Sequence, residues 1–286
     1  MNIKKNKFGT AILLGRTNVG KSTLLNKIIN KKISITSRKK NTTKKNIIGI
    51  HTEKKDQTIY IDTPGFQKNI FFFDFNLIKK TINLAQIIIF VLDRCKWTNY
   101  ENYISSIIKK NKIPVIVLIN KIDLIKDKKI ILPYINFLKK NIKNIKEIIP
   151  ISAKKKINFE KIKKIVGNLL PVEKHQFKKE QKYVFSLKFE LSEIIREKVI
   201  RYVGDEIPLI VDVKIEFLNQ KNENKIYLIA IILVNNNRQK KIIIGKNGEK
   251  IKLILNISET EIKKRLKKNI NLKLHIKIKK NICYNK

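Results

Sequence analysis

One short stretch near the start of the chain carries residue types that could hold a phosphate chain. An apolar run, residues 10–14, precedes it, and a helical-looking segment, residues 22–30, follows. In such a context glycines let backbone N–H groups curl toward phosphate oxygens, and the helix N-terminus adds positive charge. The pattern G-x-x-x-x-G-K-S therefore predicts a P-loop, made by Gly15, Arg16, Thr17, Asn18, Val19, Gly20, Lys21 and Ser22. Lys21 is expected to contact the β- and γ-phosphates, and the Ser22 hydroxyl to bind Mg²⁺.

A carboxylate and a glycine follow about forty residues after the P-loop, at the end of the isoleucine-rich run 57–61. The four residues are Asp62, Thr63, Pro64 and Gly65. D-x-x-G alone is also a common turn, but its position after a P-loop makes it informative. Asp62 is expected to hold Mg²⁺ through water, and the Gly65 N–H to meet the γ-phosphate.

Two later stretches could select a guanine base. Each follows an apolar run that resembles a buried strand, and they read Asn120, Lys121, Ile122, Asp123 and Ser152, Ala153, Lys154. Guanine shows two N–H donors on one edge, and a single carboxylate, Asp123, can accept both. We expect Asn120 to bond the other edge of the base, the Lys121 stem to cover it, and the Ala153 N–H to meet its oxygen. Adenine lacks this donor pair, so GTP and GDP are the predicted ligands.

These stretches need a scaffold that brings strand ends together. Apolar runs at 47–53, 57–61, 87–93, 113–119 and 148–151 are typical of strands, and the first two, joined by 54–56, indicate a hairpin. Residues 31–46, which include Thr42 and Thr43, are predicted to form a loop. In the phenylalanine-rich stretch 66–80, the helical spacing of Phe71, Phe75, Ile78 and Ile82 predicts a core-facing stripe.

The second half of the chain contains a different motif. Periodicity predicts a helix at 190–202, strands at 207–217, 225–234 and 272–278, and a helix opened by a capping box at 258–261. A run of three isoleucines, expected to be a strand, leads into Gly245, Lys246, Asn247 and Gly248. G-x-x-G alone can be a hairpin turn, but between a strand and a helix it is the loop with which KH domains clamp four nucleotides of single-stranded RNA. We therefore expect domains at 1–171 and 183–286, separated by a charged linker at 172–182.

The composition bears on partners and compartment. With 64 Lys and Arg against 23 Asp and Glu, the net charge of +41 indicates a polyanionic partner, RNA first and an anionic membrane surface second. The abundance of Lys, Asn and Ile would also follow from an AT-rich coding sequence, so only part of this charge supports RNA binding. Cys95 and Cys283 match no metal spacing, and no signal peptide or membrane-spanning run is apparent, which fits a reduced cytoplasmic setting. The three histidines form no catalytic constellation.

The ordered motifs resemble the translation-factor-related GTPases. The stretches 32–38, 41–43 and 49–53, and later 193–198 with 205–208, are most similar to the Era-like group of the TrmE-Era-EngA family. The resemblance implies an α/β, Ras-like P-loop G domain with a mostly parallel sheet, followed by an α+β type II KH domain. It also implies that Thr43, with Thr42 as the alternative, binds Mg²⁺ and that Asn18 can hold an activating K⁺.

At position 66, where many GTPases have a glutamine that orients water, this chain has Phe66. Phe66 cannot polarise water, so Lys21, Thr43 and Gly65 are the predicted catalytic contacts and intrinsic turnover should be slow. Thr17 replaces the usual proline of the family's P-loop, and Lys44 replaces an arginine; neither change removes a phosphate contact.

The resemblance implies a monomeric GTPase that binds small-subunit ribosomal RNA near its 3′ end and acts in small-subunit assembly, in the cytoplasm or peripherally on the inner membrane. Two alternatives stay open: a non-catalytic scaffold that holds GTP and RNA, and a related GTPase of tRNA modification or with two G domains. A single G domain followed by G-x-x-G argues against the second.

Overall fold

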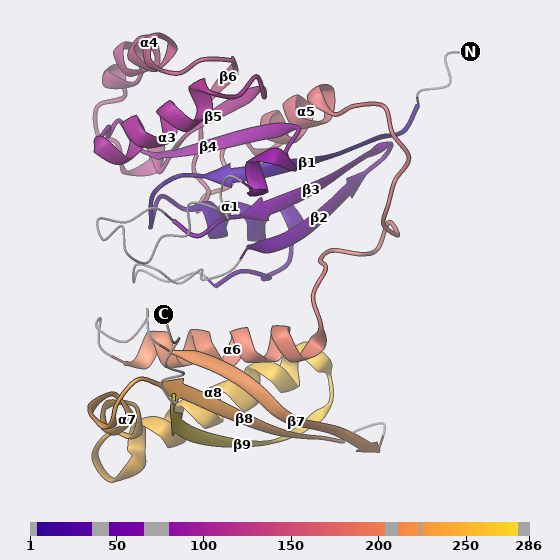
Figure 1. Cartoon of the computed structure of the whole chain (residues 1–286), viewed down its shortest axis with the longest axis vertical. Helices are drawn as coiled ribbons and strands as arrows, with labels where there is room; N and C mark the ends of the chain where they lie inside the picture. The colour runs from indigo at the N-terminus through magenta and orange to yellow at the C-terminus, as the bar shows by residue number, and fades with distance from the viewer. Residues whose placement is uncertain (1–4, 36–45, 66–79, 204–210, 223–224, 280–286) are drawn as a thin grey trace, which may run out of the picture. The chain divides into compact units, whose positions relative to one another are not determined.

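The computed structural model describes residues 5–35, 46–65, 80–203, 211–222 and 225–279 (Figure 1). The chain divides into two compact units, and the second contains everything from Phe185 onward. Thr42, Thr43, Phe66, Cys283 and most of the predicted aromatic stripe lie outside the described residues. Ile82, the last member of that stripe, is buried.

The first unit is built on a six-stranded sheet with the order β2-β3-β1-β4-β5-β6 (Figure 1). Among these strands β2 and β3 pair antiparallel, as the hairpin pattern predicted, and the other neighbours pair parallel. Both β4 and β5 are buried almost throughout, which explains their continuous apolar runs. The strands are β1 (Lys7–Leu14), β2 (Ile47–Glu53), β3 (Asp56–Asp62), β4 (Ile87–Asp93), β5 (Val115–Asn120) and β6 (Ile145–Pro150).

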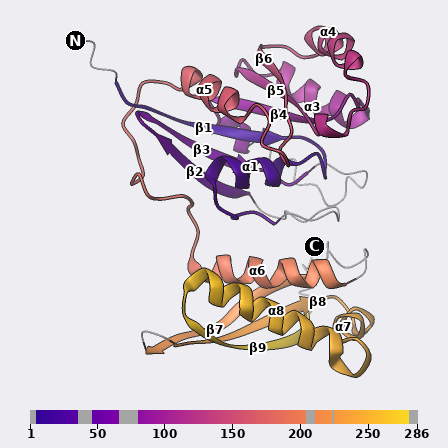
Figure 2. The ribbon, with the colours of Figure 1, turned by 180° about the vertical axis from the view of Figure 1, so that it is seen from behind.

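Helices cover the sheet of the first unit (Figure 2). Side chains of α3 and α4 share a core with alternate positions of β1, β4 and β5, whereas α1 and α5 contact β3. Because the parallel strands end at one edge of the sheet, the loops that follow β1, β3, β5 and β6 gather there. The helices are α1 (Lys21–Ile29), α3 (Asn99–Lys109), α4 (Ile131–Asn141) and α5 (Phe159–Leu169), with short 3₁₀ turns η2 (Ile122–Leu124) and η3 (Lys128–Ile130).

The stretch 172–184, most of which was predicted as a linker, is bonded to the hairpin β2–β3. The Ile50 N–H of β2 donates to the Lys182 carbonyl at 2.8 Å. Gln57 of β3 is fully buried, and its Oε1 accepts the N–H groups of Gln176 and Phe177, each at 3.0 Å. We call residues 172–184 the strap.

The second unit has a three-stranded sheet of order β7-β8-β9, in which β7 and β8 are antiparallel and β8 and β9 parallel. Its core combines one face of this sheet with side chains of α6 and α8. None of the described helices, in either unit, has both the length and the apolar character needed to cross a membrane. The elements are α6 (Leu187–Tyr202), β7 (Asp212–Asn222), β8 (Lys225–Val234), α7 (Asn237–Ile244), η4 (Lys246–Gly248), α8 (Glu249–Leu266) and β9 (Asn269–Ile278).

Two predictions for this unit were wrong. The isoleucine run before Gly245 is the end of helix α7, because the Asn236 side chain caps that helix by accepting the Gln239 N–H. Burial of Ile243 in the core outweighs the strand preference of the run. Ser258 opens no helix: it lies within α8, where its hydroxyl donates to the Ile254 carbonyl at 2.6 Å.

Candidate functional site

The P-loop lies between β1 and α1 and touches the predicted base-recognition motif directly. Gly20 has a φ of 105°, in the region that favours glycine. A Cβ added to Gly20 would lie 2.3 Å from Nδ2 of Asn120. That Nδ2 donates to the Val19 carbonyl at 2.7 Å, although the two residues are 101 positions apart. The structure therefore brings two of the predicted motifs into one site.

Lys21 is enclosed by the P-loop. Its side chain is buried, and Nζ donates to the carbonyls of Gly15 at 2.8 Å and Arg16 at 3.0 Å. Burial lowers the pKa of the Lys21 ammonium to about 8, against the opposing effect of the Asp62 carboxylate. Charge interactions are strongest where water is excluded, so this ammonium suits a polyphosphate ligand.

Asp62, at the end of β3, has the properties of a metal ligand. Its side chain is fully buried, and burial raises the pKa of its carboxyl, against Lys21 and two hydroxyl donors. Oδ2 accepts the hydroxyls of Ser22 at 2.6 Å and Ser34 at 2.9 Å. Oδ1 has no hydrogen-bond partner among the described residues, which is costly for a buried oxygen unless a cation satisfies it. The donor set fits Mg²⁺, which prefers oxygen ligands.

The motifs did not predict Ser34, whose position depends on Asn26 of α1. Oδ1 of Asn26 accepts the N–H groups of Ile33 at 2.7 Å and Ser34 at 2.9 Å. Its Nδ2 donates to the Ser34 carbonyl at 2.7 Å. These three bonds hold residues 33 and 34 against α1. An asparagine inside an otherwise amphipathic helix was the available signal in the sequence.

The D-x-x-G stretch is fixed against β1 and the P-loop. The Thr63 hydroxyl donates to the Leu13 carbonyl at 2.7 Å. A Cβ added to Gly65 would lie 2.7 Å from Cα of Thr17, so only glycine fits this close approach. Pro64 between them is half-buried. The backbone of Gly65 thus reaches the loop expected to hold the phosphates.

The predicted base-recognition residues form a bonded cluster. Oδ1 of Asp123 accepts the Ser152 hydroxyl at 2.6 Å, which orients the carboxylate. The Ala153 N–H, expected at the guanine oxygen, donates to Oδ1 of Asn120 at 2.9 Å in this structure. Ile122 packs against the core of the first unit, and Lys154 is exposed.

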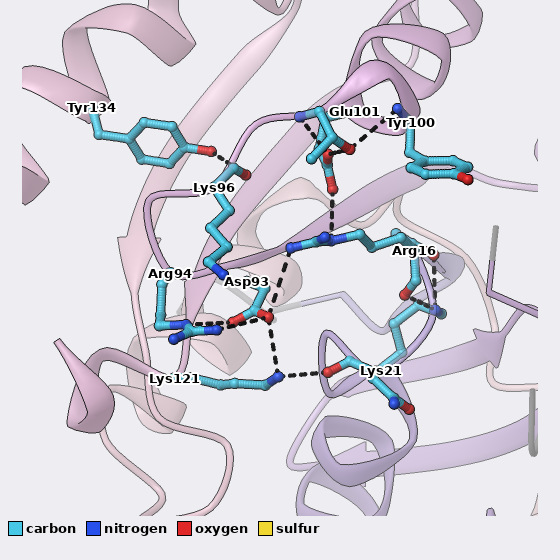
Figure 3. Close-up of polar contacts among 12 residues, drawn as sticks. Arg16, Lys21, Asp93, Arg94, Lys96, Tyr100, Glu101, Lys121 and Tyr134 are labelled. Carbon is cyan, nitrogen blue, oxygen red and sulfur yellow. Dashed lines mark hydrogen bonds and ion pairs between the residues drawn. The ribbon is translucent and has the colours of Figure 1, made fainter. Parts of the chain in front are cut away.

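Asp93, at the end of β4, links the P-loop to the base-recognition residues (Figure 3). Nζ of Lys121 lies 3.3 Å from Asp93 and donates to the Asn18 carbonyl at 2.6 Å. Arg16 approaches the same carboxylate at 3.7 Å, and Arg94 binds it at 2.9 Å. Burial alone would raise the pKa of the Asp93 carboxyl, but Arg94 and Lys121 outweigh it and hold the pKa below its usual range.

Glu101 ties the same network to helix α3 (Figure 3). The side chain is fully buried and closes a capping box with Thr98 at the helix N-terminus. Its Oε1 lies 3.2 Å from Nε of Arg16. The motifs gave no indication of Asp93 or Glu101, because their contacts with Arg16, and that of Asp93 with Lys121, join residues distant in sequence.

The G-x-x-G loop of the second unit connects α7 with α8. Gly245 and Gly248 have φ values of 73° and 75°, which favour glycine. Lys246 and Asn247 between them are exposed. The structure thus presents a lysine on a tight turn at the N-terminus of α8, where phosphate binding is favourable.

Comparison with known proteins covers both units. Residues 10–121 match the model of the 50S ribosome-binding GTPase family, and residues 206–282 match that of the KH domain. The GTPase Era of Buchnera aphidicola from Acyrthosiphon pisum (strain Tuc7) is 50% identical, covering 98% of this chain and 100% of that protein.

Two solved structures are similar over nearly the whole chain. A variant of Aquifex aeolicus Era bound to GDP and AlF₄⁻ has a TM-score of 0.88 and 31% identity, covering 96% of this chain and 95% of that one. Era in complex with MgGDPNP and nucleotides 1506–1542 of 16S ribosomal RNA has a TM-score of 0.90 and 32% identity, with the same coverage. The chain belongs to the Era family of GTPases.

Proposed function

We propose that this GTPase couples its nucleotide state to binding of small-subunit ribosomal RNA near its 3′ end, and that it acts in assembly of the small ribosomal subunit. GTP chemistry belongs to residues 1–171 and RNA binding to residues 183–286, with 172–182 between them. The supporting observation is the full-length likeness to an Era captured with both MgGDPNP and a 16S RNA fragment.

The residues of the first unit have distinct parts in the reaction, which is attack of water on the γ-phosphate. Lys21 neutralises charge that develops on the phosphate oxygens, and the Gly65 N–H binds the γ-phosphate. Ser22 and Asp62, with Thr43, would hold Mg²⁺, which supplies further positive charge to those oxygens. Asp123 and Asn120 fix the guanine base.

RNA-stimulated hydrolysis tests the coupling. GTP turnover is measured with and without the 3′ fragment of 16S ribosomal RNA, for the natural chain and for Gly248→Asp. Aspartate at a φ of 75° is strained and adds negative charge beside the bound phosphates. We expect RNA to stimulate the natural chain and to have no effect on the variant.

A matched control separates the loop from a general charge effect. Asn256→Asp adds the same charge at an exposed position of α8, the helix that follows Gly248, and should keep the stimulation. If the natural chain neither binds the RNA nor responds to it, the proposed function is wrong.

An activating K⁺ at Asn18 is part of the proposal. Asn18 has a φ of 61°, and its carbonyl accepts a hydrogen bond from Nζ of Lys121. Contact with the base-recognition motif therefore fixes the backbone of Asn18. Replacement of K⁺ by Na⁺ should lower turnover in the natural chain, and Asn18→Ala should remove the difference between the two ions.

The proposal also includes a monomer in the cytoplasm that touches anionic membrane surfaces from outside the bilayer. The net charge of +41 supports such contact. Sedimentation with anionic and neutral vesicles tests the membrane contact, and the molecular mass in solution tests the monomer. We expect binding to anionic vesicles that falls steeply with added salt.

A further inference from the structure

The sheet of the second unit has two unlike faces. Alternate residues of β8, including Leu228, Ala230 and Ile232, are buried against α6 and α8. Helix α8 runs along this sheet (Figures 1 and 2). The intervening residues of β8 point to the opposite side. No helix among the described residues contributes to that side, which we call the outer face.

The register places an aromatic and apolar group on the outer face. Phe217 of β7 lies opposite Ile229 of β8, which lies beside Lys273 of β9. Tyr227 is two residues from Ile229 and therefore on the same face. Phe217 is 45% exposed and Tyr227 36% exposed, so both rings are accessible to a ligand. Their proximity along one strand pair distinguishes them from the single apolar residues that are normal on surfaces.

Cations surround this group. Nζ of Lys225 lies 5.2 Å from the centroid of the Tyr227 ring. Lys214 and Lys273, also on the outer face, have no ion-pair partner among the described residues, whereas Lys277 pairs with Glu216 at 3.5 Å. The outer face therefore combines accessible rings with unneutralised positive charge.

That combination fits single-stranded RNA. Every base has a π-face that stacks on an aromatic side chain, and nearby lysines bind the phosphates. An acidic protein would satisfy the lysines but would not need two rings spaced along adjacent strands. The charge and the rings together favour the nucleic acid.

Strand β9 links the outer face to the helix that leads into the G-x-x-G loop. Strand β9 is an edge strand, and α7, which leads into Gly245, contacts it. The outward residues of β9 include Lys273 and His275, both exposed. RNA that leaves the loop and crosses β9 would therefore meet a basic strand first and the two rings next.

We propose that the outer face of the β7-β8-β9 sheet is a second RNA-binding surface. It takes an unpaired segment of the same RNA that the G-x-x-G loop clamps: bases stack on Phe217 and Tyr227, and Lys214, Lys225 and Lys273 bind the phosphates. This inference rests on the proposed function, and it extends the RNA footprint beyond the four nucleotides of a KH loop.

The test compares RNAs of two lengths. The short oligonucleotide is about four to six nucleotides long, enough for the four that a KH loop clamps. Its sequence is the stretch of the 16S ribosomal RNA 3′ end that the natural chain binds most tightly. The other extends it by about six unpaired nucleotides on each side. Dissociation constants are measured for the natural chain and for Phe217→Leu/Tyr227→Leu, which keeps apolar side chains at both positions and removes both rings. We expect at least a fivefold loss for the long RNA and no change for the short one.

Three further variants sharpen the result. Phe217→Leu/Tyr227→Phe keeps one of the two rings and should recover part of the affinity that the double leucine variant loses. Tyr103→Leu removes a ring that is 40% exposed on α3 of the first unit and should bind both RNAs normally. Gly248→Asp should lose binding of both the short and the long RNA.

The outcomes separate the two proposals. If the double leucine variant binds the long RNA as the natural chain does while Gly248→Asp fails, the outer face is not an RNA surface and the proposed function stands. If the natural chain binds neither RNA, both are wrong. If the double leucine variant binds free RNA normally but fails to bind assembling small subunits, a protein occupies the face and the RNA assignment is overturned.

Discussion

The hydroxyl of Ser34 donates to the Asp62 oxygen that also accepts the Ser22 hydroxyl, at 2.9 Å and 2.6 Å. Two donors on Oδ2 fix the carboxylate plane and leave Oδ1 free of partners among the described residues. Ser34 is itself buried and bonded at its backbone to Asn26. Asp62 is therefore oriented by a residue that lies outside the P-loop, the D-x-x-G stretch and the base-recognition motifs.

Replacing Ser34 with alanine should weaken Mg²⁺ binding to the nucleotide complex. The loss of one of the two donors costs about 1 kcal/mol, or roughly fivefold in the Mg²⁺ concentration at half-saturation. A Mg²⁺ titration of fluorescent GDP release measures this without hydrolysis. Ser106→Ala removes a hydroxyl bond at an exposed position of α3 and serves as control. Identical titrations for Ser34→Ala and the natural chain would show that Ser34 has no such part.

Replacing Lys21 with alanine should abolish tight GTP binding. The Lys21 ammonium is expected to make charge-assisted bonds to the β- and γ-phosphates, worth about 1.5–3 kcal/mol each, so loss of two such bonds predicts at least about a hundredfold weaker affinity. Calorimetric titration with GTP measures it. Lys27→Ala, in the last turn of the same helix, should bind normally. An unchanged GTP affinity in Lys21→Ala would show that Lys21 does not contact the phosphates.

Asp123→Asn should shift preference from guanine to xanthine. The amide can donate to the xanthine oxygen that replaces the guanine amine, but it can no longer accept both guanine donors. We expect GDP to bind about a hundredfold more weakly. Asp127→Asn, whose side chain caps η3, is the matched control. Retained guanine preference would refute the base contact.

The sequence alone was sufficient to predict the strands of the first unit and its β2–β3 hairpin. Strands such as β4 and β5 are buried on both faces, so their apolar runs are unbroken and cannot be confused with loops. The phosphate and base motifs were predictable because each depends on residues adjacent in sequence. Their contact through Gly20 and Asn120 follows from parallel strands ending at one sheet edge.

What could not be predicted depends on distant contacts. Glu101 looks like an ordinary helix-capping residue, and its contact with Arg16 exists only after β1 and α3 are placed. The end of helix α7 was mistaken for a strand because it consists of three isoleucines, which favour strands. Burial of Ile243 in the core overrides that strand preference. The strap looks like a charged linker because its bonds to β2 and β3 use mainly its backbone.

Gln57→Ala should release the strap. The Gln57 side chain accepts two strap N–H groups, and its Nε2 donates to the Phe177 carbonyl at 2.9 Å. Loss of these buried bonds should lower the free energy of unfolding by about 2 kcal/mol and speed tryptic cleavage within 172–184. Gln86→Ala, which loses a bond to Thr10 at an exposed position, is the control. Equal cleavage rates in Gln57→Ala and the natural chain would contradict the assignment.

His51 of β2 should make the unfolding free energy depend on pH. Burial lowers the pKa of its imidazole, against a 3.1 Å bond to Glu53. The unfolded chain, with an imidazole pKa of about 6.5, then binds more protons than the folded chain, so stability falls as the pH drops below about 6.5. Glu53→Gln removes the opposing carboxylate and should lower the NMR titration midpoint of His51 further. Glu147→Gln, on β6, should leave that midpoint in place. A His51 midpoint at or above the ordinary value would show that burial does not dominate.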